Sequence, residues 1–418
     1  MPVVAVGTLM YPVIPSTEEY KKAILDAIEV GYRAIDTAEL YSAEEGIGAA
    51  IAEALERGLI KDRDELFVTT RIWCNNAHPD RVLPALRESL RKLRLEYVDM
   101  FMIHVPVTSE ADVLFDFGDS PISQLDPKSV WPAMEETQKL GLAKSLGICN
   151  FSTKKLEELL AHAEIIPAAH QMELHPAWYN KKLINFCKKK GIQVVGFSPL
   201  GGKERGSDVI MSNALLKEIA EKKGKSVAQI SLRWVYEHGG CMVIKSFNKD
   251  RLKENLDIFE WGLTEEELKK IASIPQKREH DVSDCFVYPG SPFKTLEEFW
   301  DGEQTAVCSS QSEDDTSASG GANSQREPIR ERRVSQGIHF IAAQTRHTPS
   351  ISSRAATVDM PRDASGRHGQ LVLAVQPPKR QRRRLLEMLV ESIIDPLPIQ
   401  RTNLRLGSAA TPARYVLE

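Results

Sequence analysis

The sequence lacks the features that mark several classes of protein. No stretch reaches the roughly 18 consecutive apolar residues that a membrane-spanning helix needs. The N-terminal segment MPVVAVGTLMYPVIP has no basic residues before its apolar positions and is interrupted by prolines, which argues against a signal peptide. The six cysteines form no C-x-x-C pair and no zinc spacing, so they suit reduced thiols better than a disulfide framework.

The charge balance excludes a further class. The formal net charge of −4 and the pI near 6.3 lack the excess of positive charge that is typical of a nucleic-acid binder. Together with the absences above, this predicts a cytosolic protein that has neither a membrane nor a nucleic acid as its partner. We also expect a monomer.

A change in composition divides the chain after FWDGE, residues 299–303. The following stretch, SSQSEDDTSASGGANSQREPIRERR, is rich in Ser, Asp, Gly and Arg and poor in apolar residues. Such a segment cannot bury enough surface to offset the entropy lost on ordering. We therefore predict a folded domain over residues 1–303 and a mostly disordered tail over 304–418, with at most one short helix at 382–394.

The tail should be dispensable for the folded domain. Light proteolysis should cut near residues 304–320 and leave a stable fragment of about 300 residues, because exposed polar segments are cleaved first. Mass spectrometry of the products and thermal unfolding of the fragment measure this. A fragment that unfolds, or that loses its ligand, would mean that the tail docks on the domain and that the boundary is wrong.

Strand-like and helix-like segments alternate eight times within the first 303 residues. The expected strands lack polar alternation, which suits a parallel sheet covered on its outer face. Eight such units predict a (β/α)₈ barrel, with a doubly wound sheet as the alternative. We expect strands at 3–8, 33–38, 66–72, 98–104, 143–150, 168–174, 193–200 and 241–247. We expect helices at 16–31, 42–58, 81–93, 129–141, 152–163, 180–191, 213–224, 226–239 and 249–259.

Ionisable residues stand at the ends of three consecutive apolar strands. Asp36 ends the second strand, Arg71 the third and His104 the fourth, while Tyr41 follows Asp36 by five residues. Taken singly, each has an ordinary explanation: a helix cap, a surface charge, a satisfied core histidine and a packed ring. In a barrel, however, the four would share one mouth, which favours a functional site.

These four residue types suit the reduction of a carbonyl group. A cation beside a tyrosine favours the phenolate and lowers its pKa, a carboxylate balances the cation, and a histidine can hydrogen-bond the carbonyl oxygen. The hydride must come from a cofactor, since no side chain supplies one. We expect no metal, because H-E-x-x-H is missing and the first strand has no H-x-H. Glu173 is a single candidate where a glycosidase needs two carboxylates.

The sequence around the eighth strand predicts the cofactor. In VIKSFNKDRLKEN, Lys245 and Ser246 end the strand and Arg251 lies in the first turn of the next helix. Cations at a helix N-terminus form an anion site, and two of them suit the 2′-phosphate of NADP better than NAD. The glycines of GIGAAI, residues 46–51, lie inside a helix and do not form a dinucleotide-binding loop.

Several motifs in order resemble those of the aldo-keto reductase family. These are GYRAIDTAELY, LFVTTRIW, VDMFMIHVPV, SLGICNFS, HQMELHP, GFSPLG and VIKSFNKDRLKEN. The resemblance covers residues 2–303 and is closest to plant enzymes similar to chalcone reductase, codeinone reductase and deoxymugineic acid synthase. It implies a (β/α)₈ barrel that reduces aldehydes and ketones with NADPH.

The resemblance also implies roles for individual residues. Tyr41 would be the proton donor, Asp36 and Arg71 would tune it, and His104 would orient the carbonyl. The implied cofactor-binding residues are Thr8, Asp36, Cys149, Asn150, Gln171, Phe197, Ser198, Leu200, Lys245, Ser246, Phe247, Arg251, Glu254 and Asn255. The implied substrate-binding residues are Tyr41, Trp73, His104 and Trp178, with specificity in the loops 105–128, 201–212 and 275–303.

The chain departs from the family at three of these positions. Arg71 stands where the family has lysine, and Cys149 stands where it has serine. Val105 replaces a large ring, which suggests a wider pocket. The family's N-terminal hairpin has no counterpart here, so we expect a less stable barrel. Arginine favours bidentate pairing with a carboxylate, so Arg71 should leave Tyr41 less acidified and slow the reaction.

Two other functions stay open. The first is a barrel that binds NADPH but turns over poorly, as a redox-responsive binding protein. The second places a nuclear or partner-binding role in the tail, where PPKRQRRR at 377–384 resembles an import signal and RRVS at 332–335 a kinase site. Short basic patterns occur often by chance, so a solvated basic run is the favoured account of the tail.

Overall fold

The computed structural model describes residues 1–10, 13–110, 121–202, 208–279, 285–288 and 290–303, together with 356–359, 370–373 and 414–415. The chain forms two compact units, Met1–Arg332 and Arg333–Glu418, which are considered separately below.

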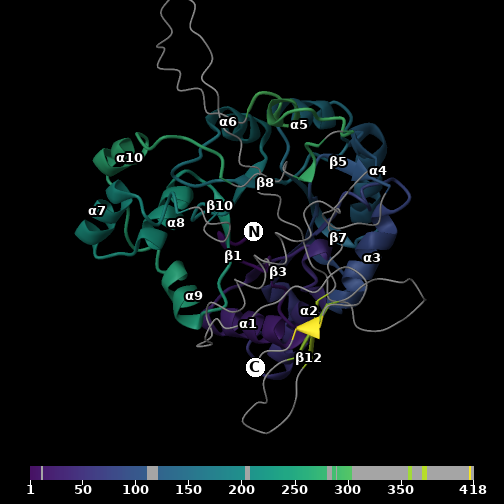
Figure 1. The fold of residues 1–418 in the computed structure, drawn as a ribbon, viewed down its shortest axis with the longest axis horizontal. Helices are drawn as coiled ribbons and strands as arrows, with labels where there is room; N and C mark the ends of the chain where they lie inside the picture. The colour runs from purple at the N-terminus through teal and green to yellow at the C-terminus, as the bar shows by residue number, and fades with distance from the viewer. Residues whose placement is uncertain are drawn as a thin grey trace, which may run out of the picture. The chain divides into compact units, whose positions relative to one another are not determined.

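Eight parallel strands in the first unit close into a barrel, which confirms the predicted (β/α)₈ fold (Figure 1). Their order around the barrel is β1-β10-β9-β8-β7-β4-β3-β2. In chain order the barrel strands are β1 (Val4–Gly7), β2 (Ala34–Asp36), β3 (Phe67–Ile72), β4 (Val98–Ile103), β7 (Ala143–Cys149), β8 (Ala169–Glu173), β9 (Gln193–Phe197) and β10 (Cys241–Ile244). Each predicted strand contains one of them, and the alternative of a doubly wound sheet is wrong.

Helices cover the outside of the barrel (Figure 1). They are α1 (Thr17–Val30), α2 (Glu44–Glu56), α3 (Val82–Leu93), α4 (Pro127–Lys139), α5 (Thr153–Leu160), α6 (Lys181–Lys190), α7 (Ala214–Lys223), α8 (Val227–Glu237) and α9 (Lys249–Leu256). Helix α1 shows how local sequence sets such a helix. The Ser16 hydroxyl accepts from the backbone N–H of Glu19, whose carboxylate accepts from Ser16 in return, and Gly31 ends the helix at φ 111°.

The structure adds elements that the sequence did not predict. Two short 3₁₀ helices, η1 (Glu39–Tyr41) and η2 (Arg63–Glu65), precede α2 and β3. Strands β5 (Val107–Ser109) and β6 (Ile122–Gln124) form an antiparallel hairpin after β4. Helices α10 (Glu265–Ile271) and α11 (Leu296–Trp300) follow α9.

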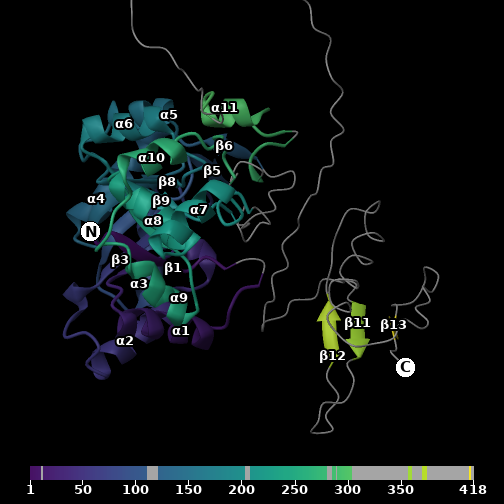
Figure 2. The same cartoon turned by 90° about the vertical axis from the view of Figure 1, so that its left-hand side faces the viewer.

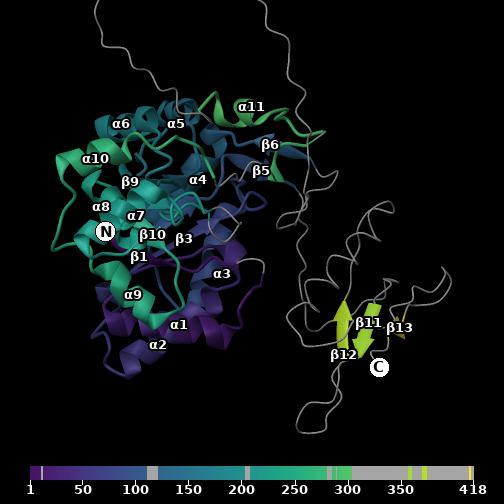
Figure 3. The same cartoon turned by 60° about the vertical axis from the view of Figure 1, so that its left-hand side comes forward.

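Polar contacts attach the FWDGE segment, residues 299–303, to helix α5 of the barrel. The carboxylate of Asp301 accepts from the Ser152 hydroxyl at 2.6 Å and pairs with Lys155. Lys155 also donates to the carbonyl of Phe299 at 2.8 Å. These contacts hold α11 beside α5, an arrangement that Figures 2 and 3 both show.

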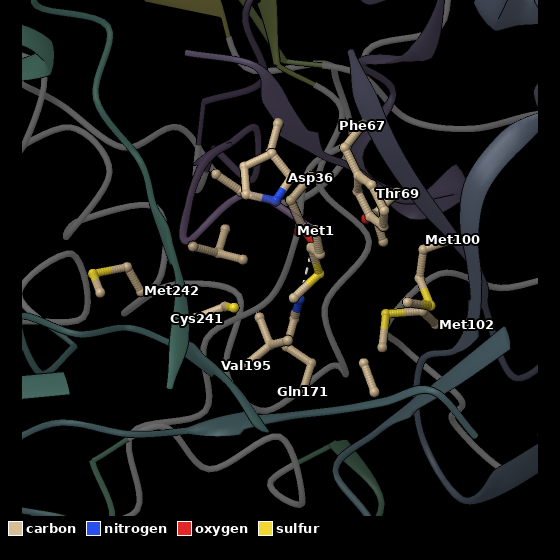
Figure 4. A pocket seen from close by; sticks show the side chains of 15 residues that line it. Met1, Asp36, Phe67, Thr69, Met100, Met102, Gln171, Val195, Cys241 and Met242 are labelled. Carbon is tan, nitrogen blue, oxygen red and sulfur yellow. Dashed lines mark hydrogen bonds between the residues drawn. The ribbon is translucent and has the colours of Figure 1, made fainter. Parts of the chain in front are cut away.

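A small cavity lies inside the barrel, and Met1 at the N-terminus, Asp36 of β2 and Gln171 of β8 contribute to its lining (Figure 4). The cavity volume is about 20 Å³, which leaves room for a single water molecule. Its lining is mainly apolar and includes Met1, Met100 and Met102. The interior is therefore a packed core, and ligand chemistry belongs at the mouth of the barrel.

The second unit contains a three-stranded sheet in the order β12-β11-β13. Strand β11 (Ala356–Asp359) pairs antiparallel with β12 (Gln370–Leu373) and parallel with β13 (Arg414–Tyr415). The sequence did not predict these strands. The expected helix at 382–394 and both basic motifs lie outside the described residues, and the boundary at 303 stays a prediction.

Two further expectations concerned reduced cysteines and membrane-spanning helices. Five cysteines, at positions 74, 149, 187, 241 and 285, are free thiols, as predicted. Among the described residues no helix is both long enough and apolar enough to cross a bilayer.

Candidate active site

The carboxyl ends of β2, β3 and β4 bring the four predicted residues together. Asp36 is the last residue of β2, Arg71 is the next to last of β3, and His104 directly follows β4. Tyr41 closes the 3₁₀ helix η1 above β2. Because the three strands are parallel neighbours, these side chains share one end of the barrel, as the sequence predicted.

Arg71 is the centre of this cluster. Its side chain is only 2% exposed, so the explanation as a surface charge is wrong. Its Nη2 forms an ion pair with the Asp36 carboxylate, its Nη1 donates to Oε1 of Gln171, and its Nε donates to the carbonyl of Thr37 at 3.1 Å. All three nitrogens of the guanidinium are therefore engaged away from Tyr41. Asp36 does not cap a helix; it balances this buried charge.

Tyr41 is paired with His104 instead of with Arg71. Its hydroxyl lies 3.3 Å from Nε2 of His104, and the two rings meet edge to face with centroids 5.6 Å apart. The Cζ atom of Arg71 lies 6.0 Å from the centre of the Tyr41 ring. Burial raises the pKa of Tyr41 well above its usual value, and the charge of Arg71 offsets this only in part.

Three residues implied for the nicotinamide end lie around Arg71. Gln171 is engaged on both sides, since its Nε2 also donates to Asp36 at 2.8 Å. Cys149 lies 3.7 Å from Nη1 of Arg71, and burial raises the pKa of its thiol to about 12. Asn150, at φ 62°, donates to the carbonyl of His104 at 2.9 Å, and none of the described residues donates to its amide oxygen. Asn150 is thus the best placed of the three to bind a carboxamide.

The predicted anion site lies where α9 begins. Asn248 caps the helix by accepting from the backbone N–H of Arg251 at 2.9 Å, and its own N–H donates to the Ser246 hydroxyl at 3.2 Å. Arg251 is exposed and has no ion pair with any described residue, while Lys245, which directly follows β10, is partly buried. Two cations, a hydroxyl and a helix N-terminus are a donor set that fits a phosphate.

The other implied cofactor residues lie near the same strand ends. Thr8 follows β1, and its hydroxyl donates to the backbone carbonyl of Asp36 at 3.0 Å, which gives it a structural contact. Ser198, directly after β9, has φ 49°. Of the remaining members of the set, Phe197 ends β9, Leu200 and Phe247 lie in the loops after β9 and β10, and Glu254 and Asn255 lie in α9. The described residues contain no cluster of three His, Cys, Asp or Glu side chains that could hold a metal ion.

Trp73 and Trp178, the predicted substrate-binding rings, have different surroundings. The Trp73 ring packs edge to face on His104 with centroids 5.0 Å apart, so it borders the site. It belongs to a buried apolar cluster that includes Val105 and Phe286. Trp178 instead lies under the guanidinium of Arg278, 4.8 Å from its ring centre. Val105 is itself buried, so a wider pocket at this position stays a hypothesis.

Sequence reasoning missed Gln171 as a partner of Arg71, and it missed Glu39 altogether. Glu39 lies two residues before Tyr41, and its carboxylate accepts from the backbone N–H of Trp73. The only signal was an acidic residue in the same turn as Tyr41, which alone resembles an ordinary exposed charge.

Comparison with known proteins agrees with this geometry. The model of the aldo/keto reductase family matches residues 4–276. A 7-acetyl-epi-neemfruitin B aldo-keto reductase of Melia azedarach is 51% identical over 305 residues, which cover 72% of this chain and 94% of that protein. Deoxymugineic acid synthase 1 of Zea mays is 48% identical over 306 residues, covering 72% and 96%.

The fold has solved counterparts as well. The crystal structure of a Bombyx mori aldo-keto reductase in complex with NADP superposes with a TM-score of 0.63 at 37% sequence identity, covering 70% of this chain and 95% of that one. With a family model over most of the barrel and two plant relatives near half identity, the chain belongs to the aldo/keto reductase family.

Proposed function

We propose that this chain is an NADPH-dependent oxidoreductase that reduces an aldehyde or ketone to an alcohol, with Tyr41 as the proton donor. The observation that supports this most is the meeting of Tyr41, His104, Asp36 and Arg71 at one end of the barrel. Family membership supports the reaction class, and the relative solved with NADP supports the cofactor.

The hydroxyl of Tyr41 would donate its proton to the carbonyl oxygen of the substrate. His104 touches this hydroxyl and would fix the position of the same carbonyl oxygen. The Trp73 ring packs on His104 and would limit the directions from which a substrate can approach. Tyr41 would thus supply the proton, His104 would orient the carbonyl group, and Trp73 would bound the substrate pocket.

Arg71 would set how readily Tyr41 gives up its proton. Its positive charge favours the phenolate, but its donors point to Asp36, Gln171 and Thr37. A charge that reaches the phenol only across the ring acidifies it less than one in direct contact. We therefore propose that the reaction is slow compared with one in which a lysine contacts the tyrosine.

NADPH, when bound, supplies the hydride that no amino-acid side chain can supply. The chain's donors fit this group: Lys245, Ser246 and Arg251 would hold the 2′-phosphate, and Asn150 would bind the carboxamide. Gln171 could contribute there only by releasing Arg71 or Asp36, because both ends of its amide are engaged.

Replacing Arg251 with alanine should weaken NADPH binding tenfold or more and leave NADH binding nearly unchanged. One charge-assisted hydrogen bond contributes about 1.5 to 3 kcal/mol, which corresponds to at least a tenfold change in Kd. Fluorescence titration of both cofactors measures this. Lys253→Ala is the matched control, since Lys253 is an exposed cation on the same helix. Equal losses for NADPH and NADH would place the 2′-phosphate elsewhere.

A second function is favoured by the engagement of Arg71. If the N–H donors of Arg71 never leave their present partners, Tyr41 would stay weakly acidic. The barrel would then bind NADPH, turn over poorly and act as a redox-responsive binding protein. Carbonyl-dependent oxidation of NADPH with formation of the alcohol would exclude this function.

We also propose that the enzyme works in the cytosol, which the free thiols support, and that it is a monomer. Its two plant relatives carry the names of different compounds, so we propose a carbonyl substrate without choosing a compound. Expressing the chain with and without residues 304–418 and localising both forms would test the compartment, and would detect nuclear import through residues 377–384.

A further inference from the structure

We propose that Glu39 is a positioning residue. It fixes the turn that carries Tyr41 against the end of β3 and so keeps the Tyr41 hydroxyl within hydrogen-bond distance of His104. The inference rests on the proposed function, because its effect is on the proton donor. No role for Glu39 follows from the family resemblance set out above.

Glu39 joins two separate segments through its carboxylate. One oxygen accepts from the backbone N–H of Trp73, directly after β3. The other accepts from Nδ2 of Asn76 at 3.1 Å, in the turn that follows. The carboxylate is partly buried and lies in η1, the same 3₁₀ helix that ends at Tyr41. A side chain in the Tyr41 turn therefore holds the loop that carries Trp73.

The contacts continue from Trp73 back to Tyr41. The Trp73 ring packs on His104, and Nε2 of His104 lies 3.3 Å from the Tyr41 hydroxyl. Glu39, Trp73, His104 and Tyr41 thus form a closed ring of contacts. If Glu39 releases Trp73, the ring opens, and the Tyr41 turn loses a hydrogen bond that ties it to the loop carrying Trp73.

The backbone beside Tyr41 gives a reason for such a tie. Ser42, the next residue, has φ 55°, in the left-handed region that a residue other than glycine occupies only at some cost. Two hydrogen bonds of the backbone also anchor the turn at Tyr41 itself, one from its N–H to Ala38 and one from the Tyr20 hydroxyl to its carbonyl. Neither restrains the Tyr41 turn relative to Trp73.

Glu39 should change its protonation state within the physiological pH range. Burial raises its pKa to about 7, and the two hydrogen bonds lower it only in part. Among the described residues, the titratable and charged groups around it are Glu44 on α2, which raises the pKa, Lys92 on α3, which lowers it, and the thiol of Cys74. A protonated carboxyl cannot accept on both oxygens, so one of the two links weakens.

The sign of the pH dependence follows from this shift. The pKa is higher in the folded protein than the usual 4.5, so the folded state holds a proton that the unfolded chain releases. Its contribution to stability is complete below pH 4.5 and is lost as the pH rises through about 7. Turnover should show the opposite trend, since the charged form accepts both hydrogen bonds. If Glu39 only stabilised the turn, stability and turnover would not change in opposite directions with pH.

The test compares Glu39→Ala and Glu39→Gln with the wild type and with Glu45→Gln, a control at an exposed glutamate nearby. Glutamine keeps one acceptor and loses the other, so at every pH it reproduces the protonated form of Glu39. The measurements are kcat with para-nitrobenzaldehyde at saturating NADPH from pH 6 to 9, the Kd of NADPH, thermal unfolding, and hydrogen exchange of the Trp73 backbone amide.

We expect Glu39→Ala to lower kcat about tenfold or more, to leave the Kd of NADPH unchanged and to speed exchange at Trp73, since small displacements of reacting groups are costly. Glu39→Gln, which stays neutral, should show at pH 8 the lowered kcat that the wild type reaches below pH 7, should show no further decline there, and should unfold at a higher temperature than the wild type at pH 8 only. An unchanged kcat in Glu39→Ala, or a wild-type pH profile in Glu39→Gln, would overturn the inference. If no form turns over, the proposed function fails, and an unchanged Trp73 exchange would then refute the tie as well.

Discussion

Replacing Tyr41 with phenylalanine should lower turnover by about 100-fold to 10,000-fold, the range that general acid catalysis contributes. The change removes only the hydroxyl, which contacts Nε2 of His104, so the ring and its edge-to-face packing stay in place. NADPH affinity should therefore be unchanged. Initial rates of NADPH oxidation with an activated aldehyde, together with a fluorescence titration of NADPH, measure both quantities.

Tyr20→Phe is the matched control for this variant. It removes a buried hydroxyl whose contact is to the backbone carbonyl of Tyr41, at 3.2 Å, and not to the Tyr41 hydroxyl or the His104 ring. Its effect on kcat should be much smaller than that of Tyr41→Phe. If Tyr41→Phe kept more than about a tenth of the wild-type rate, another group would be the proton donor.

Replacing Arg71 with lysine should raise kcat by up to about 100-fold, with little change in NADPH affinity. Arginine has a planar fork that binds Asp36, Gln171 and the carbonyl of Thr37, whereas lysine has a compact ammonium that can contact a phenol oxygen directly. A displacement of about 1 Å in a reacting group can cost 100-fold in rate, and this sets the size of the expected gain. Single-turnover rates at saturating NADPH measure it.

A second arginine provides the control for this substitution. Arg63 forms a partly buried ion pair with Asp99 at 2.6 Å, next to the opposite end of β3, so Arg63→Lys makes the same chemical change away from the site. It should leave kcat unchanged. Tyr41→Phe should abolish turnover in the Arg71→Lys background too. A kcat that stays constant or falls in Arg71→Lys would mean that the site is adapted to arginine.

The fold could be predicted because its signals are local and repeated. Each strand–helix unit has its own apolar strand and amphipathic helix, and caps such as Ser16 with Glu19 mark the boundaries. The meeting of Asp36, Arg71 and His104 needed only one further rule, that parallel neighbours in a barrel end at the same mouth. No distance had to be known for that conclusion.

The contacts that decide how the site behaves were not predictable in this way. Gln171 binds Arg71 and Asp36 across the barrel from positions 100 and 135 residues away in sequence. Only the side-chain geometry shows that Gln171 accepts a hydrogen bond from the guanidinium of Arg71. The link from Glu39 to Trp73 likewise depends on the direction of one side chain. The β5–β6 hairpin and α11 are short and lack a strong period, so their stability comes from packing against the barrel.

The most direct test of the central claim is carbonyl-dependent oxidation of NADPH by the full-length chain. The assay uses a panel of aldehydes and ketones, with NADH in parallel and Tyr41→Phe as the blank. We expect at least one carbonyl to raise the rate of NADPH oxidation above the blank, with one equivalent of alcohol formed for each NADPH consumed and with a slower rate from NADH. The contrary result is a chain that binds NADPH tightly yet oxidises it no faster than Tyr41→Phe with any carbonyl, which would make the barrel a binding protein and not a reductase.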